Sequence, residues 1–90
     1  MSCYIVTFQA KELETRQNIR ALLKTYQSYC AIHNSCWAVV TDFRAQDIRN
    51  QVCKLVQPGD RIFIVRSGIE GAWRNVLGST PSNEWLRRNL

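Results

Sequence analysis

The sequence has no apolar run that approaches the roughly 20 residues needed to span a bilayer. Its N-terminus also lacks a basic segment followed by an apolar core, the pattern of a secretory signal. Acidic residues are few, because seven Asp and Glu stand against twelve Lys and Arg, and the net charge is +5. We therefore expect no membrane association, a cytoplasmic location and an affinity for acidic partners.

Residues for metal or nucleophilic chemistry are equally sparse. The sole histidine is His33, and a lone histidine beside a turn is usually structural or solvated. The four cysteines form no C-x-x-C pair, so they do not match the usual spacing of zinc ligands. We expect buried, reduced thiols and no cofactor, with a metal site or a disulfide as the alternatives. The cysteines are Cys3, Cys30, Cys36 and Cys53.

The remaining pattern is that of one folded domain spanning residues 1–90. Runs of β-branched and aromatic residues predict strands, and apolar residues at i, i+3, i+4 and i+7 predict helices. Strands are expected at Cys3–Phe8, Tyr29–His33, Cys36–Thr41 and Arg61–Arg66, with a weaker edge strand at Ala72–Leu77. Helices are expected at Glu14–Ser28, at Ala45–Val56 and, as a short terminal helix, from Thr80-Pro81 onward.

This order, β-α-β-β-α-β followed by an edge strand and a short helix, predicts an α+β split βαβ sandwich. The first and last strong strands are so apolar that we expect both to be buried on both faces. Two helices would cover one face of the antiparallel sheet, and the terminal helix or a second subunit would cover the other. We expect a homodimer, with Trp73, Trp85 and Leu86 at its interface; core packing is the alternative for the tryptophans.

Basic residues recur at spacings that would gather them on surfaces. Arg16, Arg20 and Lys24 lie at i, i+4 and i+8 of the first expected helix and would form a basic ridge. The planar guanidinium group suits phosphate oxygens, so these side chains are candidates for binding nucleic acid or a nucleotide. Ordinary solvated charge is the alternative. The other candidates are Arg44 and Arg49 at the second helix, and Arg66 and Arg74 around the last strand.

The topology and several segments together resemble a known family. The segments are YIVTF, SCWAVVTD followed by AQDIRNQV, DRIFIVRSG and the terminal NEWLRRNL. They are similar to the SinR-like family, which is related to the small CRISPR-associated adaptation subunit and to VapD-type ribonucleases. The resemblance covers nearly the whole chain and implies a ferredoxin-like fold and a homodimer.

The resemblance also implies where a nuclease site would lie. Nuclease members of the superfamily carry an Asp at the end of the first strand, near its symmetry mate, where the two bind a divalent metal. The matching residue here is Gln9, whose neutral amide is a poor ligand for Mg²⁺. Glu12 and Glu14 lie nearby, but acidic residues are ordinary in a first helical turn.

The sequence therefore favours a non-catalytic, dimeric protein that binds nucleic acid or a nucleotide through arginines, without a metal. One alternative is a protein-interaction module, such as a phage or defence-related inhibitor, that docks an acidic partner protein. A degenerate or metal-independent ribonuclease is the other alternative.

Overall fold

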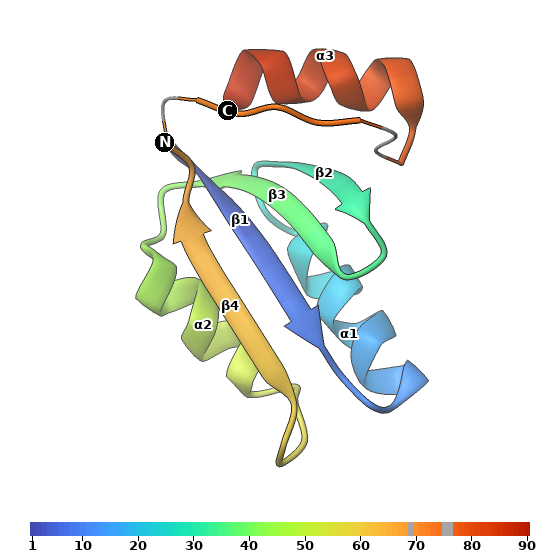
Figure 1. Ribbon diagram of the computed structural model, residues 1–90. Helices are drawn as coiled ribbons and strands as arrows, with labels where there is room; N and C mark the ends of the chain where they lie inside the picture. The colour runs from blue at the N-terminus through green and yellow to red at the C-terminus, as the bar shows by residue number, and fades with distance from the viewer. Residues whose placement is uncertain (69, 75–76) are drawn as a thin grey trace.

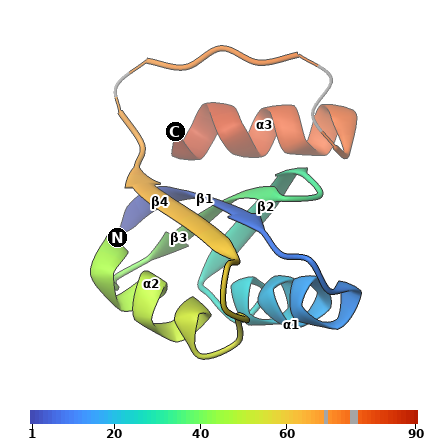
Figure 2. The same ribbon diagram turned by 60° about the horizontal axis from the view of Figure 1, so that its bottom comes forward.

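The computed structural model describes residues 1–68, 70–74 and 77–90, which form a sheet and three helices. The sheet lies between two helical layers, because α1 and α2 cover one face and α3 lies across part of the other (Figure 1, Figure 2). In chain order the elements are β1 (Ser2–Gln9), α1 (Leu13–Leu23), β2 (Ser28–His33), β3 (Cys36–Thr41), α2 (Ala45–Cys53), β4 (Arg61–Arg66) and α3 (Ser79–Asn89).

The strand order is β2-β3-β1-β4, and each neighbouring pair is antiparallel. In the β1–α1–β2 unit, β3 lies between the two strands, and in the β3–α2–β4 unit β1 lies between them. This arrangement is the split βαβ sandwich, so the predicted α+β, ferredoxin-like fold is confirmed. The register pairs Val6 with Trp37 on one side of β1 and Thr7 with Phe63 on the other.

The main core lies between the sheet and the first two helices. Alternate residues of β1, namely Tyr4, Val6 and Phe8, point into it, as the period of two in a strand requires. Burying a large aliphatic side chain contributes about 1.5–3 kcal/mol, so the few residues shielded completely from solvent account for much of the stability. The fully buried members of this core are Val6, Ile19, Leu23, Val39, Ile48 and Val52.

A second, smaller core lies under α3. Leu86 of α3 packs there with Cys3, Cys30 and Ala38 from the three strands nearest to it. The terminal helix therefore covers this part of the opposite face, one of the two covers expected from the sequence. Strand β1 is accordingly packed on both faces along its first half.

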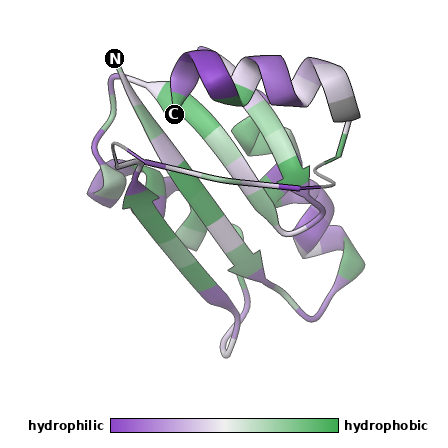
Figure 3. Ribbon diagram, turned by 45° about the horizontal axis from the view of Figure 1, so that its top comes forward, coloured by the Kyte–Doolittle hydropathy of each residue, from purple (hydrophilic) through white to green (hydrophobic). Residues whose placement is uncertain are grey.

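Strand β4 does not follow the expectation of burial on both faces. Its residues Ile62 and Ile64 pack against the main core, but Phe63 is 62% exposed and Val65 is 44% exposed. The reason is that α3 lies over the β2 side of the sheet and leaves the β4 side open. Figure 3 shows the hydrophobic strand β4 beside, rather than beneath, the largely hydrophilic α3.

Both central helices end earlier than their apolar periodicity predicts. Helix α1 ends at Leu23, and the Thr25 hydroxyl then donates to the Leu22 carbonyl at 2.6 Å. Tyr26 continues the apolar stripe from a turn, where its ring is buried and its hydroxyl donates a hydrogen bond to Gln51 Oε1 at 2.6 Å. Helix α2 ends at Cys53, and the Leu55 backbone N–H then donates to the Val52 carbonyl at 2.9 Å in a tight turn.

Two smaller expectations also need correction. The described residues of the expected edge strand, 72–74 and Leu77, form no strand, while residues 75–76 lie outside the described part. Helix α3 begins at Ser79, one residue before the expected start. At the start of helix α2 the Asp47 carboxylate accepts the Arg44 backbone N–H at 3.0 Å.

The cysteines are all free thiols, and Cys3, Cys30 and Cys36 are buried as expected. Cys53 is exposed at the end of α2, so the packing role expected for it is wrong. None of the described helices is both long and apolar enough to cross a bilayer.

Candidate functional site

The basic ridge predicted on α1 is only partly available to a ligand. Arg16 donates from Nη1 to the carbonyls of Ala10 at 2.8 Å and Lys11 at 3.1 Å. Arg20 donates from Nε to the carbonyl of Asn34 at 3.2 Å, and its guanidinium carbon lies 6.0 Å from the centre of the Phe8 ring. These two arginines therefore tie α1 to the connection after β1 and to the β2–β3 turn, while Lys24 is exposed.

The other predicted basic residues are exposed but lie apart. Arg66 pairs with Tyr4 near the start of β1, whereas Arg16 contacts carbonyls just beyond its end, about 20 Å along the strand. Arg49 lies on α2 and donates to the Asn50 side chain, and Arg44 precedes that helix. Arg74 follows β4. The fold thus does not bring the seven predicted residues to one surface.

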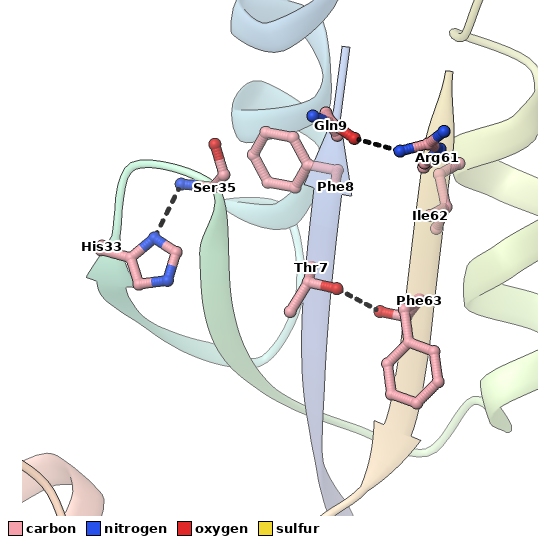
Figure 4. Close-up of a pocket in the computed structure, with 8 residues that line it drawn as sticks. All are labelled: Thr7, Phe8, Gln9, His33, Ser35, Arg61, Ile62 and Phe63. Atoms are coloured by element: carbon pink, nitrogen blue, oxygen red, sulfur yellow. Dashed lines mark hydrogen bonds between the residues drawn. The ribbon is translucent and has the colours of Figure 1, made fainter. Parts of the chain in front are cut away.

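A different set of residues converges on a pocket of about 320 Å³ at the carboxyl end of β1 (Figure 4). The register of β1 and β4 explains this convergence, because Thr7 lies opposite Phe63, and Gln9 lies opposite Arg61. Residues two apart share a face, so these four side chains all belong to the sheet face opposite α1 and α2. The lining residues are Thr7, Phe8, Gln9, His33, Ser35, Arg61, Ile62 and Phe63.

The amide of Gln9 and the guanidinium of Arg61 form the polar end of the pocket. Arg61 donates from Nη1 to Gln9 Oε1 at 3.1 Å, which leaves the other guanidinium donors for a ligand. The Thr7 hydroxyl already has a partner within the sheet, because it donates to the Phe63 carbonyl at 3.4 Å. The Phe63 ring stands on the same face and is largely exposed, so the pocket combines a cation with an apolar ring face.

The β2–β3 turn supplies the opposite wall. The Phe8 backbone N–H donates to the Ser35 carbonyl at 3.0 Å, which fixes the turn against β1. The Ser35 backbone N–H donates to His33 Nδ1 at 3.3 Å, so the neutral imidazole carries its proton on Nε2. His33 Nε2 and the Ser35 hydroxyl are then hydrogen-bond donors at this wall, well suited to anionic oxygen.

The chemistry of the pocket is that of binding an anion and a ring. Asp60 adds a negative charge beyond Arg61, but its carboxylate accepts the backbone N–H groups of Gln57 at 2.8 Å and Lys11 at 3.3 Å. Cys36 lies opposite Thr7 in the sheet, and burial raises the pKa of its thiol, which keeps it a poor nucleophile at neutral pH. No cluster of three or more metal-ligating side chains occurs in residues 1–68, 70–74 and 77–90.

The residues expected at an interface lie in and around the second core. Leu86 is 1% exposed, so it packs within its own chain and is not open to a partner; its assignment to an interface is corrected. Trp85 donates its indole N–H to the Ser28 hydroxyl at 2.7 Å, and Trp73 donates to the Asn83 side chain at 2.9 Å. Both indoles are partly buried.

Sequence reasoning placed Gln9 correctly at the end of β1 but missed Arg61, Phe63 and Ser35, and set His33 aside. The available signal was the alternation of side chains along RIFIVR, which places Arg61 and Phe63 on one face of β4. The alternation alone did not reveal that this face of β4 is exposed to solvent.

No protein-family model matches the chain, and no curated protein matches its sequence at a significant level. A solved structure is similar: the crystal structure of a hypothetical protein from Thermus thermophilus superposes with a TM-score of 0.70 at 22% sequence identity. The match covers 83% of this chain and 92% of the other. At this identity the similarity shows the α+β fold shared by the two chains.

Proposed function

We propose that this chain binds single-stranded nucleic acid or a nucleotide in the pocket between Arg61 and Phe63. The observation that carries the proposal is a guanidinium group beside an exposed aromatic ring on an open sheet face. Base stacking on an aromatic side chain contributes about 1–3 kcal/mol, and an arginine offers paired donors to the adjoining phosphate. His33 and Ser35 supply further donors at the far wall.

We also propose that binding occurs without metal-dependent cleavage. The resemblance to the SinR-like family would put a metal-binding carboxylate at Gln9. Here the Gln9 amide oxygen accepts a hydrogen bond from Arg61 at 3.1 Å, and a fixed positive charge at this distance repels a divalent cation. The same charge attracts phosphate.

Some of the arginines predicted from the sequence extend this site. Arg49 lines a pocket of about 260 Å³ together with Phe63, so cations lie on both sides of β4. Lys24, Arg44, Arg66 and Arg74 are exposed and contribute longer-range attraction for a polyanion. Arg16 and Arg20 have mainly a structural role in this proposal.

Binding of a fluorescent single-stranded oligonucleotide at low salt tests the proposal. We expect Arg61→Ala to weaken binding about tenfold, the effect of a lost charge-assisted hydrogen bond, and Phe63→Ala to weaken it at least fivefold. Arg88→Ala removes another exposed charge, on α3 and outside the pocket, and should leave affinity within twofold. Equal losses for Arg61→Ala and Arg88→Ala, or no binding by the unmodified protein, would contradict the proposal.

Self-association is the second part of the proposal. Val65 is exposed at the end of β4 away from Arg61, and its partner Ile5 and the following Trp73 pack against the margin of the second core. A homodimer formed there would bury apolar surface and leave the Arg61 pocket accessible. Sedimentation should give twice the 10.4 kDa chain mass, and Val65→Lys should give one chain mass. A single-chain mass for the unmodified protein would contradict this part.

One observation favours the protein-interaction alternative. Strand β4 is at an edge of the sheet, with exposed arginines at both ends and exposed Phe63 and Val65 between them. Such an edge can pair with an extended acidic segment.

Incubation of labelled RNA with the protein tests the ribonuclease alternative. Cleavage that is lost in Gln9→Ala would show that Gln9 serves catalysis.

A further inference from the structure

Another pocket, of about 400 Å³, adjoins the Arg61 pocket at the end of the sheet. It lies between the connection that follows β1 and the turn that precedes β4. Gln9 and Arg61 line both pockets, so their hydrogen-bonded side chains form the wall between them (Figure 4). The proposed function uses only the first of the two. We name the other one the Lys11 pocket; its lining residues are Gln9, Ala10, Lys11, Gly59, Asp60 and Arg61.

The hydrogen-bond acceptors around the Lys11 pocket already have partners within the chain. The Asp60 carboxylate accepts the backbone N–H of Gln57 at 2.8 Å with one oxygen and that of Lys11 at 3.3 Å with the other. The carbonyls of Ala10 and Lys11 both accept Nη1 of Arg16, at 2.8 and 3.1 Å. These contacts hold the two segments together. They also leave the pocket poorly suited to a ligand that donates hydrogen bonds.

The cations of the Lys11 pocket, in contrast, are available to a ligand. Neither the Lys11 ammonium group nor the Arg61 guanidinium group forms an ion pair within the described part of the chain, and both side chains are exposed. The lining thus carries two positive charges against the single negative charge of Asp60. Arg16 adds a third positive charge beside the pocket, and the acidic Glu12 does not line it. The charge and the free donors together favour an anion.

The adjoining Arg61 pocket indicates which anion this is. Arg61 and Phe63 are two residues apart on one face of β4, roughly 7 Å, a distance that the sugar of a nucleotide bridges. A terminal phosphate carries about 1.5–2 negative charges at neutral pH, which matches two unpaired cations better than the single charge of a phosphodiester. We propose that the Lys11 pocket binds the terminal phosphate of a nucleotide or a nucleic-acid strand whose base lies against Phe63. This inference rests on the proposed function.

Titration calorimetry at low salt, with unlabelled ligands, tests the inference in two comparisons. The first is thymidine against its 5′- and 3′-monophosphates. The second is a short oligothymidylate that carries a phosphate at the 5′ end, at the 3′ end or at neither end. We expect a terminal phosphate to tighten binding about tenfold, the effect of one charge-assisted hydrogen bond. The comparison that shows this preference identifies the source as a free nucleotide or a strand end, and no preference in either overturns the inference.

Two variants locate the phosphate. Lys11→Ala removes the ammonium group, keeps the backbone N–H that Asp60 accepts, and should reduce the preference for a terminal phosphate at least threefold. Lys54→Ala removes another exposed lysine, at the end of α2 and outside the pocket, and should retain the preference. Equal losses in the two variants overturn the inference.

The same titrations separate this inference from the proposed function. Ligands without a terminal phosphate can bind in a manner that depends on Arg61 and Phe63 and gain nothing from the phosphate. In that case only the role of the Lys11 pocket is wrong. If no ligand of either kind binds, the proposed function is wrong as well.

Discussion

Gln9 and Arg61 decide, at the scale of single residues, what the end of β1 can bind. A carboxylate at this position would attract a divalent cation, whereas the amide and the adjoining guanidinium present a positive charge. The identity of Gln9 was readable from the sequence, and so was its place after the strand. Its hydrogen-bond partner Arg61 could not be identified from the sequence, because Arg61 is 52 residues away and the β1–β4 register is fixed only by long-range packing.

The thiols provide a residue-scale prediction. Cys53 is exposed, whereas Cys3, Cys30 and Cys36 are buried, and burial raises the pKa of the Cys3 and Cys36 thiols. Only the thiolate is nucleophilic, so these two sites are both shielded and protonated at neutral pH. We expect one thiol to react rapidly with a disulfide reagent in the folded protein. All four should react after unfolding in guanidinium chloride.

The matched control for this prediction is Cys53→Ser, which should remove the rapid phase without slowing the reaction of the other three thiols. A rapid phase that persists in Cys53→Ser would show that a buried thiol is accessible. That result would contradict the burial of Cys3, Cys30 and Cys36.

At the scale of elements, the sequence predicted strands better than helix ends. Each strong strand was placed within one residue, because a continuous apolar run bounded by polar residues has few alternatives. The helix ends were misplaced, since Tyr26, Leu55 and Val56 continue the apolar stripe from turns and still pack on the core. Burial of β4 was overestimated because an apolar run does not show whether one face or two will be covered.

Helix α1 allows an element-scale test of two side chains with the same charge and different surroundings. Arg20 donates to Asn34 and lies over Phe8, so it joins α1 to the β2–β3 turn. We expect Arg20→Ala to lower the free energy of unfolding by about 1 kcal/mol, the usual net contribution of such a hydrogen bond. Urea unfolding followed by tryptophan fluorescence measures it.

Lys24 is the control, because it lies one turn further along the same ridge and is exposed. Lys24→Ala should change the unfolding free energy by less than about 0.5 kcal/mol. If the two variants lose the same stability, the contacts of Arg20 do not secure the turn. A phosphate-binding ridge would instead show a loss of oligonucleotide affinity in both variants.

At the scale of the whole molecule, α3 divides the second sheet face into two halves with different properties. The half near β2 is packed under α3, and the half near β4 remains open and holds the Arg61 pocket. A 90-residue chain has a limited core, so a helix that adds a second one contributes substantially to stability. The same helix leaves β4 uncovered, and the binding proposed at Arg61 and Phe63 depends on this open half.

Truncation of Leu86 tests whether α3 is an integral layer of the domain. This side chain is 1% exposed and packs among Cys3, Cys30 and Ala38, so Leu86→Ala leaves a cavity in the smaller core. We expect it to lower the free energy of unfolding by about 2–4 kcal/mol, a large part of the roughly 5–15 kcal/mol of a small domain. Leu77→Ala, at an exposed leucine before α3, should cost less than about 0.5 kcal/mol. Urea unfolding of the two variants gives both values, and equal small losses would show that the sheet folds without α3.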